Sequence, residues 1–242
     1  MTGVRVELTA FDVPDLDVAT EFWCDLTGWR VVRQVPDWVT IEAGDGQQIA
    51  LQLAPDHVPP VWPGQDWPQQ VHLDLYVADE FHAAEQAVAL GAERLRDADG
   101  FVVLADPAGH PFCLARDAGQ PAGVTTLANT VFDCPDAGAL AAFYAGLLDL
   151  QVIVDEPDWV KIEGDGHRLA FQRVDDYAPP RWPDPAFPQQ GHLDLLVDDR
   201  DAVGAVEQRA FDLGATRLPG AGDGFYVYAD PAGHPFCLTF PF

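Results

Sequence analysis

The chain has 242 residues, of which 48% are hydrophobic and 21% are charged, a balance typical of a globular protein with a buried core. Thirteen basic residues stand against 39 acidic ones, and the resulting net charge of −26 excludes nucleic acids and anionic membrane surfaces as partners. No apolar run approaches the roughly 18 residues of a membrane span, and the N-terminus lacks the pattern of a secretory signal, so we expect a cytoplasmic protein.

Internal repetition is the most informative feature of the sequence. The ten residues ADPAGHPFCL occur at Ala105–Leu114 and again at Ala229–Leu238, and PQQVHLDL at Pro68–Leu75 returns as PQQGHLDL at Pro188–Leu195. The Gly- and Pro-containing stretch Asp117–Gly123 has the composition of a linker. We therefore predict two tandem domains, residues 1–118 and 123–242.

A shorter pattern occurs twice within each repeat. An apolar alternating run ends in an aspartate, a helical pattern of about three to four turns follows, and short strand-like runs separated by turns close the unit. The aspartates are predicted to cap the helices, and they are Asp15, Asp79, Asp136 and Asp199. The pattern predicts an α+β fold. In each domain, two paired strand–helix–strand–strand–strand units form a curved, barrel-like mixed sheet with helices outside.

Strand alternation assigns the faces of the second unit. In Val71–Val77, Leu73 and Leu75 point to the side that packs under a helix, whereas His72 and Asp74 point to the other side. The second repeat places its own pair in the same way, at His192 and Asp194. Such a pair can fix a histidine tautomer or exchange protons, so these four residues are the catalytic candidates. The alternative is a pair of histidines that are hydrogen-bonded within a packed sheet.

The cysteines show no CxxC pair and no disulfide-like spacing, so we expect reduced thiols that are mostly buried. Cys113 and Cys237 occupy identical strand contexts, in which small buried side chains are the default. His110 and His234 fall in the DPAGH turn, where we expect a surface role, and the adjacent glycines should have positive φ.

Aromatic residues recur around the predicted cavity. One group lies among prolines in the loops that lead into the His–Asp strands, as anchors of these loops or as a lid: Trp62, Trp67 and Trp182. A second group of strand residues is predicted to line the curved sheet and contact a ligand: Trp38, Gln52, Trp159 and Gln172.

The motifs PxxWP, PQQxHLDL and DPAGHPFCL, with helix ends ALGA and DLGA, resemble the vicinal oxygen chelate superfamily over essentially the whole chain. That superfamily includes glyoxalase I, bleomycin-resistance proteins, fosfomycin-resistance enzymes and extradiol dioxygenases. The resemblance implies a curved eight-stranded sheet with a metal or ligand inside the curve. The four metal-ligand positions that it implies fall, in the first repeat, on Leu8, Gln52, His72 and Cys113. In the second repeat they fall on Asn129, Gln172, His192 and Cys237.

Only one of these four positions in each repeat keeps its usual ligand, so we expect no cofactor and no tightly bound iron, nickel or zinc. A divalent metal, if bound, would use His72, Cys113, His192 and Cys237. The two-histidine, one-carboxylate set of extradiol dioxygenases is missing from the four positions.

Two functions remain open. The first is a protein that binds a small organic molecule in the sheet cavity without the standard metal, as bleomycin-resistance proteins do. The alternative is a glyoxalase-like metal-dependent lyase, isomerase or related enzyme that uses His72 and His192. The duplication also predicts a monomer with an internal pseudo-dimer, or else a homodimer.

Overall fold

A computed structural model describes residues 3–241, and it contains the predicted unit four times. The first unit comprises β1 (Val4–Val13), α1 (Leu16–Thr27), β2 (Arg30–Val35), β3 (Trp38–Glu42) and β4 (Gln48–Leu53). The second comprises β5 (Val71–Val77), α2 (Glu80–Ala89), β6 (Glu93–Ala98), β7 (Phe101–Ala105) and β8 (Pro111–Arg116). The third comprises β9 (Thr126–Cys134), α3 (Ala137–Leu148), β10 (Gln151–Glu156), β11 (Trp159–Gly164) and β12 (His167–Arg173). The fourth comprises β13 (Gly191–Val197), a 3-10 turn (Arg200–Ala202), α4 (Val203–Asp212), β14 (Thr216–Gly222), β15 (Phe225–Ala229) and β16 (Pro235–Thr239).

The helices begin and end for local reasons. Asp15, Asp79 and Asp136 cap α1, α2 and α3 by accepting hydrogen bonds from free backbone N–H groups, as predicted. Asp199 caps the 3-10 turn, and α4 begins after this turn at Val203. None of the helices that the structure describes is long and apolar enough to cross a membrane.

Two eight-stranded mixed sheets carry the helices on their outer faces, which is the predicted fold class, although neither sheet closes into a barrel. Sheet A has the strand order β14-β15-β16-β13-β1-β4-β3-β2, and sheet B has the order β10-β11-β12-β9-β5-β8-β7-β6. Parallel pairs such as β1–β4 and β5–β8 make both sheets mixed.

The partners within each sheet differ from the expected ones. Consecutive units were expected to pair, whereas sheet A joins the first unit to the fourth and sheet B joins the second to the third. The antiparallel ladders β1–β13 and β5–β9 make these joins. Each repeat therefore contributes strands to both sheets. Its long connection, residues 54–70 in the first repeat and 174–190 in the second, carries the chain from one sheet to the other.

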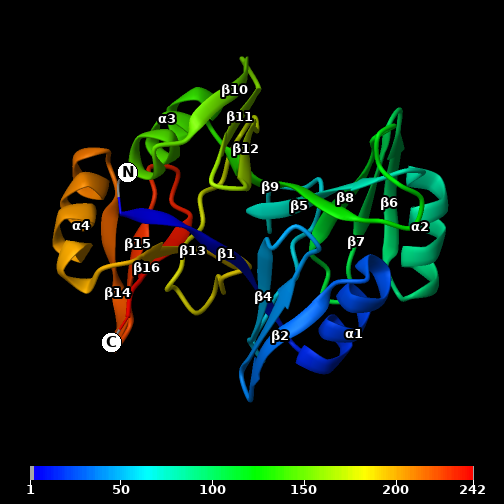
Figure 1. Cartoon of the computed structure of the whole chain (residues 1–242), viewed down its shortest axis with the longest axis horizontal. Helices are drawn as coiled ribbons and strands as arrows, with labels where there is room; N and C mark the ends of the chain where they lie inside the picture. Colours follow the sequence, from blue (N-terminus) through cyan, green and yellow to red (C-terminus); the bar gives the residue numbers. More distant parts are fainter. Residues whose placement is uncertain (1–2, 242) are drawn as a thin grey trace.

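The helices, by contrast, pair with each other within their own repeat. Figure 1 shows α1 and α2 on one side of the molecule and α3 and α4 on the other. Between the first two units, Phe112 makes edge-to-face contacts with Phe22 and Trp23. Phe236 contacts Phe143 and Tyr144 in the same way in the second repeat. These aromatic contacts belong to the main hydrophobic core.

The two repeats are related by an approximate two-fold axis. Thr9 on β1 and Thr130 on β9 occupy matching positions, and their hydroxyl oxygens are hydrogen-bonded at 3.0 Å. At the start of the His–Asp strands the two repeats differ, with Val71 in the first and Gly191 in the second, because the packing near the axis leaves no room for a second side chain. A side chain at Gly191 would come within 2.7 Å of the Ala10 carbonyl oxygen and 3.1 Å of Val71, which is its counterpart in the first repeat.

Candidate functional site

Both His–Asp strands lie at the centre of their sheets. In sheet B, β5 runs between β9 and β8, and in sheet A, β13 runs between β1 and β16. Leu73 and Leu75 belong to the core beneath the helices, and strand alternation therefore places His72 and Asp74 on the opposite, helix-free face. His192 and Asp194 occupy the helix-free face of sheet A for the same reason.

In sheet B, His72, Asp74 and Cys113 form one cluster, the sheet B site. His72 Nε2 lies 3.5 Å from Asp74 Oδ1, and Cys113 is opposite Asp74 in the β5–β8 register. One ligand atom from each of the three residues lies within 4.8 Å of the other two. Asn129, on β9 of the other repeat, donates a hydrogen bond to Asp74 Oδ2 at 2.9 Å. The site therefore needs both repeats.

In sheet A, His192, Asp194 and Cys237 form the matching cluster, the sheet A site. His192 Nε2 lies 3.4 Å from Asp194 Oδ1. Leu8 stands opposite Asp194, where sheet B has Asn129 opposite Asp74. Leu8 packs with three further residues of the helix-free face, which are Ala10, Ala50 and Trp38. The sheet A site is thus bordered by an apolar patch. In sheet B the position equivalent to Leu8 is occupied by the polar Asn129.

Two residues that the sequence analysis did not select extend the sheet A site. Gln189 Nε2 lies 3.2 and 3.3 Å from the carboxylate oxygens of Asp12 and 2.9 Å from Nδ1 of His192. When His192 is neutral, donation from the Gln189 amide makes Nδ1 an acceptor and leaves the ring proton on Nε2, facing Asp194. Asp12, Gln189 and His192 therefore form one buried polar chain, and Asp194 lies beside its end, with Oδ1 3.4 Å from His192 Nε2.

The sheet B site has the same residue types but not the same chain. Gln69 Nε2 lies 3.2 Å from both carboxylate oxygens of Asp133, while Nδ1 of His72 is buried without a hydrogen-bond partner. The sequence did hold a signal for these residues. Asp12 matches Asp133, and Gln69 matches Gln189, at equivalent positions of the repeats.

Burial and charge act against each other at these sites. Burial alone would lower the pKa of His72, but bonds to Asp74 and Cys113 outweigh it and hold the pKa well above its ordinary value. Burial likewise lowers the pKa of His192, and the carboxylates of Asp194 and Asp12 reverse the shift to a raised pKa. Burial raises the pKa of Asp12 to about 6 and also raises the pKa of the Cys113 thiol. The cysteines are therefore poor nucleophiles in the absence of a partner that removes their proton.

The four implied ligand positions regroup because each sheet mixes the repeats. The set in sheet A is Leu8, Gln52, His192 and Cys237, and the set in sheet B is Asn129, Gln172, His72 and Cys113. The sequence analysis grouped these positions by repeat, so half of each set came from the wrong sheet. Asp74 and Asp194, which the sequence analysis selected as catalytic candidates but not as metal ligands, stand beside the histidines on their own strands.

The predicted aromatic residues divide between the sheets and the connections. Trp38 is opposite Gln52 and Trp159 is opposite Gln172 in the strand registers, and the Trp38 ring lies 6.3 Å from that of His192. A Cβ at Gly220 would lie 3.5 Å from the Trp182 ring, which places Trp182 against β14 of sheet A. Trp62 is half-buried in the first connection. Trp67 does not join either site and stacks instead on Phe187, 5.0 Å away.

The expectation that His110 and His234 lie at the surface is wrong, since each is only 2% exposed. His110 Nε2 contacts the Asp12 carbonyl oxygen at 2.7 Å, and His234 Nδ1 lies 3.1 Å from Asp230. The turn folds inward because the N–H groups of Ala108 and His110 donate to Asp106. The glycines of these turns do have positive φ, 88° at Gly109 and 98° at Gly233.

The donor chemistry of the two clusters fits zinc better than iron or nickel. Imidazole nitrogen, carboxylate oxygen and thiolate sulfur are all zinc ligands, and three protein ligands leave a position for water or substrate. Each cluster has a single histidine, so neither is a two-histidine, one-carboxylate iron site. His72, Asp74 and Cys113 would hold the ion in sheet B, where it would polarise a substrate oxygen or a bound water.

A family model described as "Glyoxalase-like domain" matches residues 9–115 and again residues 129–239. Among curated proteins, none matches the chain significantly. Glyoxalase I from Zea mays is a similar solved structure, with a TM-score of 0.68, 18% identity, and coverage of 98% of this chain and 92% of that chain. A putative dioxygenase from Bacillus subtilis subsp. subtilis str. 168 has a TM-score of 0.63 and 12% identity, and covers 97% of this chain and 84% of that chain.

At these identities the solved structures establish the fold alone. The family model, in contrast, covers most of the sequence in two consecutive matches. The chain therefore belongs to the glyoxalase-like domain family, as a tandem pair with the fold of the vicinal oxygen chelate superfamily.

Proposed function

We propose that the protein binds a small organic molecule on the helix-free face of sheet A, without a metal. The apolar patch around the buried His192–Asp194 pair carries this proposal. Ligand sites are commonly apolar surfaces with a few convergent polar groups, which fix the orientation of the ligand. Trp38 and Leu8 supply apolar area, and His192 supplies a polar group that is hydrogen-bonded to Gln189 and lies beside the carboxylate of Asp194.

The polar chain also permits proton exchange with the ligand. Neutral His192 can take a proton from a ligand group, and Asp194 would stabilise the imidazolium that forms; the imidazolium can return that proton to a ligand oxygen and become neutral again. In this reading His72 and Asp74 act similarly in sheet B, on a more polar ligand group, because Asn129 replaces Leu8 there.

A second candidate function is a metal-dependent lyase or isomerase at the sheet B site. The observation that favours it is the set of three donors of different types, His72, Asp74 and Cys113, within 4.8 Å of one another. Burial of the cysteine opposes metal binding, because the thiol must lose its proton to coordinate.

Elemental analysis of protein purified without a histidine tag separates the two functions. We expect iron, nickel and zinc each well below one ion per chain. Stoichiometric zinc that is lost in His72→Ala but kept in His192→Ala would support a metal-dependent enzyme at the sheet B site. It would contradict metal-free ligand binding in that sheet.

Ligand binding is tested separately by ligand-observed NMR with a library of small oxygenated compounds. Compounds that bind should lose affinity about tenfold or more in His192→Ala, since the buried polar contact is lost. The exposed His82→Ala is the matched control. The proposal fails if His192→Ala and His82→Ala bind the library equally.

A further inference from the structure

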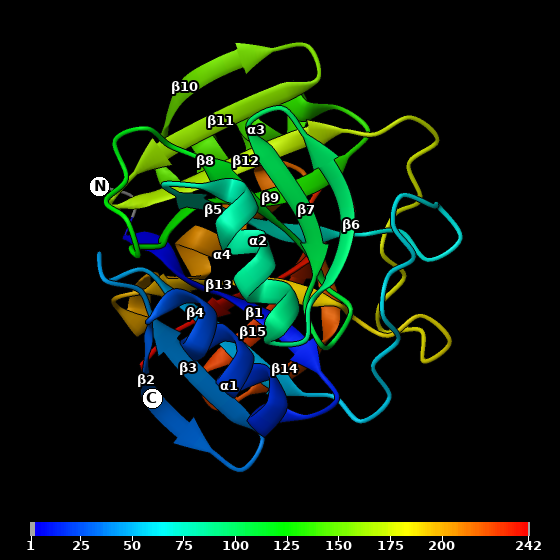
Figure 2. The same ribbon diagram turned by 90° about the vertical axis from the view of Figure 1, so that its right-hand side faces the viewer.

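A pocket lies between the two long connections, away from both sheet sites. Its volume is about 270 Å³, and it is lined by residues 65–68 and 70 of the first connection and by residues 178–181, 187, 188 and 190 of the second. Figure 2 shows these connections side by side at one edge of the molecule, in cyan and yellow. Neither the His–Asp pairs nor the cysteines line it.

The walls of the pocket are mostly apolar and rigid. Trp67 and Phe187, which are counterparts in the two repeats, stack with ring centroids 5.0 Å apart and an interplanar angle of 30°. The remaining apolar lining is largely proline: Pro68, Pro179, Pro180 and Pro188. Such a lining suits a small apolar group and loses little side-chain entropy when it binds one.

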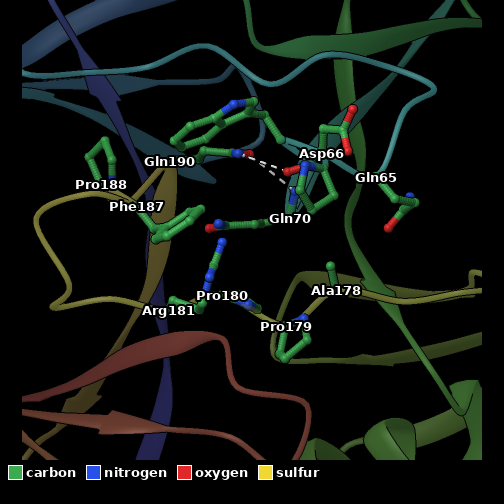
Figure 3. A pocket seen from close by; sticks show the side chains of 12 residues that line it. Gln65, Asp66, Gln70, Ala178, Pro179, Pro180, Arg181, Phe187, Pro188 and Gln190 are labelled. Carbon is green, nitrogen blue, oxygen red and sulfur yellow. Dashed lines mark hydrogen bonds between the residues drawn. The ribbon is translucent and has the colours of Figure 1, made fainter.

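Two glutamines in matching positions differ in their hydrogen bonds. Gln190 accepts a hydrogen bond from the Gln70 backbone N–H at 3.1 Å and donates one to the Pro68 carbonyl at 2.8 Å, so it ties the two connections together. Gln70 is also buried, at 9% exposure against 3% for Gln190, but its side-chain carbonyl oxygen has no hydrogen-bond partner among residues 3–241. Figure 3 shows the Gln70 side chain extending into the pocket. A buried acceptor of this kind favours a ligand that donates to it.

Arg181 supplies a positive charge at the same place. Its guanidinium lies over the Phe187 ring, and among residues 3–241 no carboxylate forms an ion pair with it, despite the net charge of −26. Asp66 also lines the pocket, but Figure 3 shows its carboxylate pointing away from Arg181. The counterpart of Arg181 in the first repeat is Val61, so the charge is specific to one side of the axis.

We propose that this pocket binds a small hydroxycarboxylate with an apolar body. The carboxylate pairs with Arg181, whose fork of donors matches its two oxygens. The hydroxyl donates to the free carbonyl oxygen of Gln70. Since the side chains of Arg181 and Gln70 both line the pocket and point towards each other in Figure 3, the hydroxyl belongs next to the carboxylate, as in an α-hydroxy acid. The apolar body lies against the prolines.

Isothermal titration calorimetry with three related probes tests the chemistry. Mandelate has the ring, the α-hydroxyl and the carboxylate, phenylacetate lacks the hydroxyl, and mandelamide lacks the charge. We expect one mandelate per chain, phenylacetate about three- to tenfold weaker, and mandelamide at least tenfold weaker. Equal binding of mandelate and mandelamide, or no mandelate binding, would overturn the proposal.

Binding of mandelate to single-residue variants tests whether it occupies this pocket. Arg181→Val, which copies Val61, should weaken mandelate binding at least tenfold. Arg33→Val should not, because Arg33 is an exposed arginine of β2 that likewise forms no ion pair among residues 3–241. Gln70→Leu should remove the preference for mandelate over phenylacetate. Mandelate binding that is lost in His192→Ala or His72→Ala but kept in Arg181→Val would locate the probe in the sheets and refute the inference.

Discussion

Gln189 and Gln69 occupy the same position in the two repeats, yet only Gln189 reaches its histidine. The difference separates a histidine with a fixed tautomer from one whose Nδ1 has no partner. This position is where the two sheet sites diverge without any change of residue type.

Replacing Gln189 should therefore alter His192 more than the matching change alters His72. In the wild-type protein at alkaline pH, we expect neutral His192 with its proton on Nε2. Gln189→Leu should shift the ring towards a mixture of tautomers, because the donor to Nδ1 is lost. Nitrogen-15 NMR of the imidazole rings measures the tautomers. Gln69→Leu is the control, and an equal change at both histidines would contradict the contacts.

His110 gives a pH dependence of stability. Burial lowers its pKa to about 4, below the value of about 6.5 for the unfolded chain. Above about pH 6.5, His110 is neutral in both the folded and the unfolded protein, and its titration does not lower the free energy of unfolding. As the pH falls towards 4 only the unfolded state takes up the proton, so the free energy of unfolding decreases by up to about 1.4 kcal/mol per pH unit.

His110→Gln, which keeps a donor for the Asp12 carbonyl, should make the stability curve less steep between about pH 6.5 and 4. Urea unfolding at several pH values measures the slope. Comparison with wild type cancels the opposite contribution of Asp106, whose pKa burial raises to about 6 and whose stabilisation is lost as the pH rises through that value. Equal slopes in the variant and the wild type would show that His110 does not titrate differently on folding.

At the scale of single residues, the sequence predicted the His–Asp pairs through strand alternation but not Asp12, Gln189 or the inward His110. Alternation reports which side of a strand a residue faces. It does not report which loop side chain reaches that face from another element, and Gln189 precedes its strand.

The helices show how far local chemistry determines an element. The sequence predicts the N-terminal caps of α1, α2 and α3, because an aspartate side chain satisfies N–H groups two or three residues away, whatever the tertiary structure. The prediction is wrong for α4, which has no side-chain cap because Asp199 caps the preceding 3-10 turn instead. At the C-terminal ends, Gly28 follows α1 with φ 73°, while its counterpart after α3 is Asp149 with φ 61°. An aspartate in the left-handed region carries a cost that glycine does not.

Asp149→Gly should therefore stabilise the protein by about 0.5–1 kcal/mol, and Gly28→Asp should destabilise it by a similar amount. Asp149 is exposed, and no hydrogen bond of its side chain opposes the change among the described contacts. The midpoints of urea denaturation measure both effects. If Asp149→Gly lowers the midpoint, the aspartate side chain contributes more than its backbone conformation costs.

At the scale of the molecule, the sequence predicted the units and the sheet size but not which units pair. All four units present the same kind of first strand, so consecutive pairing and crossed pairing bury similar faces. The long connections and the contacts at the axis distinguish the two pairings. One such contact is Val71 against Gly191, which relates residues far apart in the sequence.

Crossed pairing means that the linker between the repeats is not what holds them together. We propose residues 1–118 and 123–242 as the two repeat domains, with the ladders β1–β13 and β5–β9 joining them as a dimer interface would. A protease site placed in the exposed stretch 121–124 should be cut without separating the fragments. Size-exclusion chromatography with light scattering should show one species of the uncut mass, about 26.4 kDa, if the chain is a monomer with an internal pseudo-dimer. A homodimer would give twice that mass, before and after cutting. Fragments that elute separately without denaturant would contradict the crossed ladders, because each repeat could then complete its own sheet.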